Sequence, residues 1–160
     1  MFQIGDKVAY PMHGAGIIEG VEERCILGEA HQYYVLKLSI GNVEVLVPTA
    51  SIDEIGVRYV ASGQEADEAI RCFIECEDSH EDGNWNKRYR DNIEKLKDGQ
   101  LCEVAKITKH LLRKEQKKSL SNAERKMLNY AKSALVSELG LSKNMDCRQV
   151  ETMLMERISI

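Results

Sequence analysis

A short stretch near the middle of the chain combines aromatic and basic side chains at a density typical of nucleic-acid-binding surfaces. Three cations and two aromatic residues fall within six positions, Trp85-Asn86-Lys87-Arg88-Tyr89-Arg90. Cations can neutralise phosphates, and an aromatic ring can stack on a base or wedge between base pairs. Helical spacing would also put Trp85, Tyr89 and Leu96 on one side, so they could equally form a core stripe. The segment predicts a DNA contact, with packing as the alternative role of Trp85.

A second set of cations repeats with helical spacing further along the chain. Counted from Lys106, the offsets are 0, 3, 4, 7, 8, 11 and 12, which places the set on one helical face. Its members are Lys106, Lys109, His110, Arg113, Lys114, Lys117 and Lys118. The apolar residues of the segment occupy another face. We therefore expect a helix over 101–118 that packs on one side and exposes positive charge on the other, although an ordinary solvated face would look the same.

The other candidates for chemistry are weaker. Cys72, Cys76 and His80 recur every four residues, but a closed zinc site takes four ligands and this spacing is not common. We expect the two cysteines to be small core residues and His80 a loop residue. The glycine-rich His13-Gly14-Ala15-Gly16 lacks the lysine and the helix of a phosphate loop, so we expect a turn. No catalytic motif is present in a supporting context. We expect no enzyme activity, no cofactor and no metal.

The net charge of −4 hides an uneven distribution. The chain has 160 residues, with 22 Lys and Arg against 26 Asp and Glu. The net charge is −4 for residues 1–62, −7 for 63–83, +8 for 84–132 and −1 for 133–160. The total argues mildly against a nucleic-acid partner, whereas the basic stretch points to a polyanion-binding part of the chain.

The composition is that of a soluble protein of one or two small domains, with 43% apolar and 30% charged residues. No apolar run approaches the ~20 residues of a membrane helix, and the N-terminus has no signal-peptide pattern. The odd, scattered cysteines predict free thiols in a reducing cytoplasm. They are Cys25, Cys72, Cys76, Cys102 and Cys147.

The first part of the chain predicts short antiparallel strands between glycine turns. The candidate strands are Lys7–Tyr10, 17–21, Tyr33–Leu38 and Val43–Val47. A turn or bulge at Gly14–Gly16 and turns at Gly28 and Gly41-Asn42 separate them, and Pro48 ends the last one. Such strands suggest a small, strongly bent sheet or barrel.

The second part predicts helices, because no proline follows Pro48 and the apolar spacing becomes helical from about residue 64. We expect five helices, over 64–77, 84–97, 101–118, 121–139 and 146–157. Gly99 should end the second, and a capping box at Ser121 and Glu124 should begin the fourth, which should end at Leu139 before Gly140. The predicted fold class is α+β. Residues 1–60 form a β domain and residues 61–160 a helical domain, divided into a linking helix and loop (61–83), basic helices (84–139) and a C-terminal extension (140–160).

Several motifs resemble the CarD/CdnL family of bacterial transcription regulators. They are Ile4 through Gly16, Tyr33 through Leu38, Val45 through Pro48, Asn84 through Arg90, and Leu120-Ser121 with Lys126-Met127-Leu128. The first half alone is also similar to the polymerase-interacting domain of the transcription-repair coupling factor. Motifs from both halves occur in the family's order over about residues 2–139.

The resemblance implies a Tudor-like or SH3-like small barrel that docks on the β subunit of RNA polymerase, and a helical bundle that binds promoter DNA. Trp85 matches the family's minor-groove wedge. The basic positions that match the family are Lys87, Arg88, Arg90 and Arg125. Lys126 and Lys132 add positive charge to the same predicted helix as Arg125 and complete the candidate DNA-binding set. The implied polymerase-binding residues are Arg24, Ile26 and Leu46, of which Leu46 departs from members that carry a basic residue there.

These implications give a hypothesis of function. A monomeric cytoplasmic regulator, tethered to polymerase, would stabilise the open promoter complex at the upstream edge of the bubble without reading sequence. Tethering would compensate for the weak DNA affinity of an acidic chain. The alternative is a protein adaptor that binds polymerase and never contacts DNA.

Overall fold

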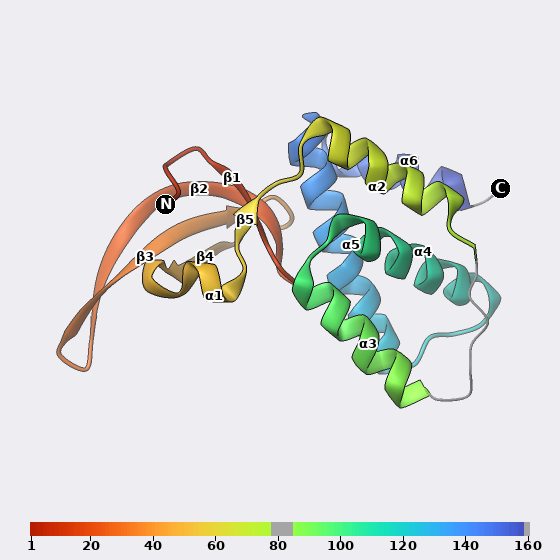
Figure 1. The fold of residues 1–160 in the computed structure, drawn as a ribbon, viewed down its shortest axis with the longest axis horizontal. Coiled ribbons are helices and arrows are strands. Elements are labelled where there is room, and N and C mark those ends of the chain that lie inside the picture. The colour runs from red at the N-terminus through yellow and green to blue at the C-terminus, as the bar shows by residue number, and fades with distance from the viewer. Residues whose placement is uncertain (78–84, 159–160) are drawn as a thin grey trace.

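The computed structural model describes residues 1–77 and 85–158, and of Trp85 the backbone only. A curved sheet forms one end of the molecule and a helical bundle forms the other (Figure 1). The chain passes from the sheet into the bundle once, through the segment after β5. The predicted α+β class, with strands first and helices second, is confirmed.

The sheet has five antiparallel strands in the order β4-β3-β2-β1-β5. Their bounds are Lys7–Tyr10 (β1), Gly14–Ile26 (β2), Glu29–Leu38 (β3), Glu44–Pro48 (β4) and Arg58–Tyr59 (β5). Between β4 and β5 lie a short 3-10 turn, Thr49–Ser51, and the single-turn helix α1, Ile52–Ile55. Ile52 of α1 and Val57 pack on Val8, Leu36 and Val47, so α1 covers the inner face of the curved sheet.

The β2–β3 hairpin turns at Leu27-Gly28, with φ angles of 53° and 81°. Two consecutive residues in this left-handed region give a two-residue loop whose twist matches that of the strands. The predicted break at Gly28 is therefore confirmed. The predicted turn at Gly41-Asn42 is confirmed as well, with φ angles of 79° and 51°.

The expected turn or bulge at Gly14–Gly16 is wrong, because these residues pair regularly with β1. These residues are the first three of β2 and pair with Tyr10, Ala9 and Val8 of β1. The chain turns just before them, where the His13 N–H donates to the Tyr10 carbonyl at 2.9 Å. A Cβ on Gly16 would lie 2.2 Å from the Lys37 carbonyl oxygen, so this glycine permits close strand packing instead of a turn.

The bundle contains five helices within the described part of the chain. They are α2 (Gly63–Glu75), α3 (Trp85–Asp98), α4 (Leu101–Lys117), α5 (Asn122–Lys143) and α6 (Cys147–Ile158). The capping box expected at Ser121 and Glu124 is present, and Ser62 with Glu65 forms another at the start of α2. Gly99, with φ 72°, ends α3 as predicted. Apolar residues of all five helices share one core.

Helix α5 does not end at Leu139 as expected but continues through Gly140 to Lys143. Asn144, at φ 53°, then caps the helix in the left-handed conformation. A Cβ on Gly140 would lie 2.9 Å from the Met145 carbonyl oxygen. This glycine therefore lets the chain fold back over the last turn of the helix instead of ending it.

A polar junction joins the sheet to the bundle. The carboxylate of Glu138 on α5 is 5% exposed and accepts from Arg58 Nη1 at 2.6 Å, Arg58 Nη2 at 2.9 Å and the Ala61 N–H at 2.8 Å. Next to it, the Ala15 N–H of β2 donates to Ser137 Oγ at 2.9 Å. Lys7 of β1 donates to the Leu141 carbonyl at 3.1 Å. These bonds fix α5 on β1, β2 and β5, so the two halves have one relative orientation.

Candidate nucleic-acid interface and docking edge of the sheet

The three residues predicted to bind polymerase share one face of the sheet. Leu46 pairs with Val35, and Val35 pairs with Gly20, so these three positions lie in one row across β4, β3 and β2. Alternation from Gly20 then places Arg24 and Ile26 on the same face as Leu46. Arg24 is four residues beyond that row, about 13 Å at ~3.3 Å per residue. This face is opposite the one that carries Ile18, Leu36 and Tyr34 into the core.

The same face is accessible. Ile26 is 48% exposed and Leu46 is 36% exposed. The Arg24 guanidinium lies 3.2 Å from Glu22, with both side chains about half exposed, so this ion pair is weak and a partner's carboxylate could replace it. The accessible face therefore carries Arg24 and Ile26 near the β2–β3 hairpin and Leu46 on the edge strand β4.

Helix α3 carries the next group of predicted residues. Lys87 and Arg90 are exposed and Arg88 is half-buried, all within its first two turns. Trp85 begins the helix, but its side chain lies outside the described part of the structure. Tyr89 packs on the bundle core and Leu96 is buried within it. The core-stripe alternative is therefore confirmed for these two residues.

The predicted residues of α5 do not form one group. Arg125 and Lys126 are exposed in its first turns. Lys132 lies further along the helix and forms an ion pair with Glu151 of α6 at 2.7 Å. Its charge is therefore partly compensated within the bundle, whereas Arg125 and Lys126 lie near the end of α5 that meets α3.

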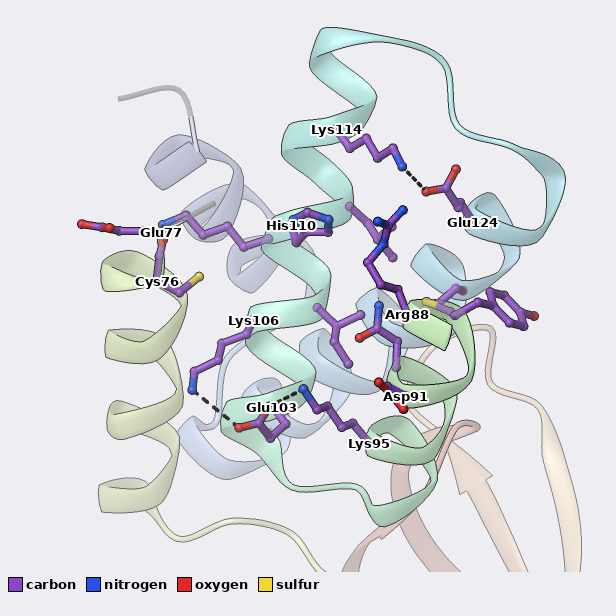
Figure 2. A pocket seen from close by; sticks show the side chains of 16 residues that line it. Cys76, Glu77, Arg88, Asp91, Lys95, Glu103, Lys106, His110, Lys114 and Glu124 are labelled. Carbon is purple, nitrogen blue, oxygen red and sulfur yellow. Dashed lines mark hydrogen bonds and ion pairs between the residues drawn. The ribbon is translucent and has the colours of Figure 1, made fainter. Parts of the chain in front are cut away.

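A cavity of about 350 Å³ marks the place where α3, α4 and the start of α5 meet (Figure 2). Arg88 and Lys95 enter it from α3, Lys114 from α4 and Glu124 from α5. Lys114 Nζ donates to Glu124 at 2.6 Å. The lining therefore mixes both signs of charge and is not a purely cationic pocket. The cavity lies between the basic part of α3 and the first turns of α5.

Glu124 shows how this cavity is held together. Burial by itself would raise the pKa of the Glu124 carboxyl, but the hydrogen bond from Lys114 and those from Ser121 outweigh it and lower the pKa below its usual value. The carboxylate stays charged at neutral pH. It caps α5 and binds α4 at the same time.

The predicted basic face of α4 needs a correction. Lys109 is 3% exposed, and its Nζ donates to the carbonyls of Ile74 at 2.7 Å and Cys76 at 3.1 Å, where α2 ends. Lys114 is also largely buried, in its ion pair with Glu124. Helical spacing alone could not show that α2 covers this part of the face. Lys106, Lys117 and Lys118 are exposed, as expected.

No group of three or more metal-ligating side chains occurs within residues 1–77 and 86–158, and His80 lies outside that part of the chain. Cys72 and Cys76 are half-buried on α2 instead of core residues. Cys72 lies against Cys102 of α4, with 2.9 Å between the two sulfur atoms. Sequence spacing gave no sign of this contact, because the two cysteines lie on different helices.

Comparisons with known proteins match both halves of the chain. A sequence model described as the CarD-like/TRCF RID domain matches residues 2–61, and one described as CarD, C-terminal domain, matches residues 70–155. The chain belongs to the CarD family. A Bacillus subtilis (strain 168) protein named "Putative transcription factor YdeB" is 40% identical over 152 residues, which cover 95% of this chain and 99% of that protein. The solution structure of the 72-residue N-terminal domain of Myxococcus xanthus CarD is 27% identical, with a TM-score of 0.33, over 39% of this chain and 83% of that one.

Membership in the CarD family assigns the protein to transcription regulation, with an N-terminal domain of the type that interacts with RNA polymerase. CarD-like transcription factors are not enzymes, so that expectation is confirmed. Among the described helices, none has the length and apolar character that crossing a bilayer requires.

The sequence analysis did not identify Arg58 and Glu138, which form an ion pair at the junction of the sheet and the bundle. A signal for Glu138 was present, because it is a single charged residue within the apolar run from Leu135 to Leu141. A charge that is buried in this way needs a partner. Nothing in the sequence indicated that the partner would be Arg58.

Proposed function

We propose that this CarD-family protein stabilises the open promoter complex. Its sheet would bind the RNA polymerase β subunit through Arg24, Ile26 and Leu46, and its bundle would bind promoter DNA at the upstream edge of the bubble. One observation carries the proposal: exposed cations lie on neighbouring ends of α3 and α5, in a bundle that the Arg58–Glu138 ion pair joins to the polymerase-interaction domain. The DNA-binding residues would be Lys87, Arg88, Arg90, Arg125 and Lys126, with Lys132 at the margin.

The mechanism needs no catalysis. Docking on polymerase gives the bundle a high effective concentration at the DNA, so weak phosphate contacts suffice on a chain of net charge −4. Trp85, at the start of α3, would wedge into an unstacked base step. Such a wedge binds the distorted fork better than closed duplex and shifts the equilibrium toward the open complex. This function places the protein in the cytoplasm, as a monomer bound to polymerase.

A second candidate function is a polymerase adaptor that does not contact DNA. It is favoured by the compensated cations of the bundle, since Lys95, Lys106, Lys114 and Lys132 all lie within ion-pair distance of a carboxylate. Under this alternative the exposed cations of α3 and α5 are ordinary solvated surface.

The lifetime of open complexes formed by the cognate polymerase tests the proposal. We expect Trp85→Ala, and separately the pair Lys87→Glu and Arg90→Glu, to shorten this lifetime several-fold, because about 1.4 kcal/mol of stabilisation corresponds to a tenfold change. Arg148→Glu is a matched control, since Arg148 is exposed on α6 away from α3 (Figure 1). Equal lifetimes for all these variants would instead support the adaptor.

A further inference from the structure

Two cysteines from different helices of the bundle meet at its surface. The Cys72 thiol, on α2, donates to the Cys102 sulfur, on α4, across 2.9 Å. A disulfide bond is about 2.05 Å long, so the two sulfur atoms need approach by only about 0.9 Å to be joined. Both residues are half-buried, which leaves them accessible to a small oxidant.

The surroundings of the pair hold the two helices together near this point. Lys109 of α4 donates to the Ile74 and Cys76 carbonyls, so the end of α2 is already fixed on α4 without a covalent bond. The helices run side by side in the same direction (Figure 1). The two helices that carry Cys72 and Cys102 are therefore already held together with the two sulfur atoms in contact.

The surroundings of Cys102 favour the neutral thiol. Burial, the hydrogen bond with Cys72 and the charges of Cys72 and Glu68 raise the pKa of the Cys102 thiol to about 11, although Lys106 lowers it. Little of Cys102 is thiolate at neutral pH, and thiolate is the reactive form, so we expect the reaction of this thiol with an oxidant to be slow. The expected free thiols of a reducing cytoplasm are compatible with this geometry.

We propose that Cys72 and Cys102 are a redox-modification site, at which a peroxide converts the two thiols into a disulfide that links α2 to α4. One thiolate attacks an oxygen of the peroxide, so that an S–O bond forms and the O–O bond breaks, which leaves a sulfenic acid on that sulfur. The departing hydroxide takes up the proton that this thiol released and becomes the first water. The second sulfur then attacks the sulfenic sulfur, the S–S bond forms and the hydroxyl leaves as a second water. The two thiols lose two protons and two electrons, and hydrogen peroxide takes up both and is reduced to two waters.

The sulfur–sulfur contact within residues 1–77 and 85–158 joins Cys72 to Cys102, and the other cysteines lie elsewhere. Cys76 donates weakly to the Phe73 carbonyl of its own helix at 3.7 Å. Cys25 is exposed at the β2–β3 hairpin, and Cys147 is half-buried at the start of α6. Oxidation of the folded monomer should therefore give one specific intramolecular bond. This inference does not rest on the proposed function.

The test treats the full-length chain with hydrogen peroxide and then blocks the remaining thiols with iodoacetamide under denaturing conditions. We expect the loss of two hydrogen masses, three alkylated cysteines out of five, and a Cys72–Cys102 cross-link in the peptide map. The cross-link closes a loop of about 30 residues, so the oxidised form should melt about 5–10 °C higher than the reduced form.

Conservative variants complete the experiment. Cys72→Ser and Cys102→Ser should abolish the cross-link and the rise in Tm, whereas Cys25→Ser and Cys147→Ser should retain both. Five alkylated cysteines after peroxide, a sulfinic acid at Cys72 or Cys102, or a Cys72–Cys76 bond would each overturn the proposal. The map of the unsubstituted chain decides the matter even if a serine variant fails to fold.

Discussion

The ion pair between Arg58 and Glu138 gives the sharpest prediction about stability, because it joins the sheet to the bundle at a buried point. The Glu138 side chain is 5% exposed in the protein, and in Arg58→Met its carboxylate would keep, among the described residues, only the Ala61 N–H as a donor. Removing one partner of a buried pair typically costs about 3–5 kcal/mol. Arg58 itself is 37% exposed, so water can reach the site, and we expect the lower end, about 3 kcal/mol.

Urea unfolding measures this loss through the midpoint and the m-value. Glu138→Gln keeps an acceptor for the Ala61 N–H and should cost less, about 1–2 kcal/mol. The matched control is Arg24→Met, which breaks an exposed pair with Glu22 and should change stability by no more than about 0.5 kcal/mol. The reasoning is refuted if Arg58→Met is as stable as the Arg24 variant.

Three further predictions concern single positions. Gly16→Ala should lower the free energy of unfolding by more than about 2 kcal/mol, because the new Cβ would overlap a carbonyl of β3. A Cβ at Gly20 would meet no atom within 4 Å, so Gly20→Ala should be near neutral in the same unfolding assay. Lys109→Met should cost about 1–3 kcal/mol, because two carbonyls at the end of α2 lose their donor, and a thermal melt checks this. Folding lowers the pKa of Glu124, mainly through its ion pair with Lys114. This pair therefore stabilises the protein at pH values above the usual pKa of 4.5, and the stabilisation is lost as the pH falls through the lower pKa of the folded state. Unfolding at pH 5 and pH 3 should therefore show a smaller acid loss in Glu124→Gln, and an equal loss would contradict the assignment.

Local signals in the sequence predicted the secondary structure well. The turn at Gly28, the stop at Gly99 and the capping box at Ser121 each depend on a few neighbouring residues, so the sequence contains all the information needed. Gly16 and Gly140 were misinterpreted for the opposite reason. Each is a glycine because a distant or returning backbone approaches it, and the same residue type also marks turns and helix ends.

Tertiary contacts decide which charges are available for binding, and the sequence could not supply them. Lys109 has the spacing of an exposed helical stripe but is covered by the end of α2. Lys132 is half-buried on α5 and forms an ion pair with Glu151 of α6. The contact of Cys72 with Cys102 likewise depends on how α2 packs on α4. Lys87 and Arg90 are exposed as predicted, and their role in DNA binding stays a prediction.

Cross-linking in the assembled complex tests the central claim most directly. A photoreactive amino acid replaces Lys87 on α3, and the protein is combined with the cognate RNA polymerase on a promoter fork. We predict a cross-link to DNA at the upstream edge of the bubble that requires polymerase, because the tether supplies the local concentration. The same group placed at Arg148 on α6 should give none. Polymerase binding with no cross-link from position 87, or a cross-link of equal yield without polymerase, would contradict the account.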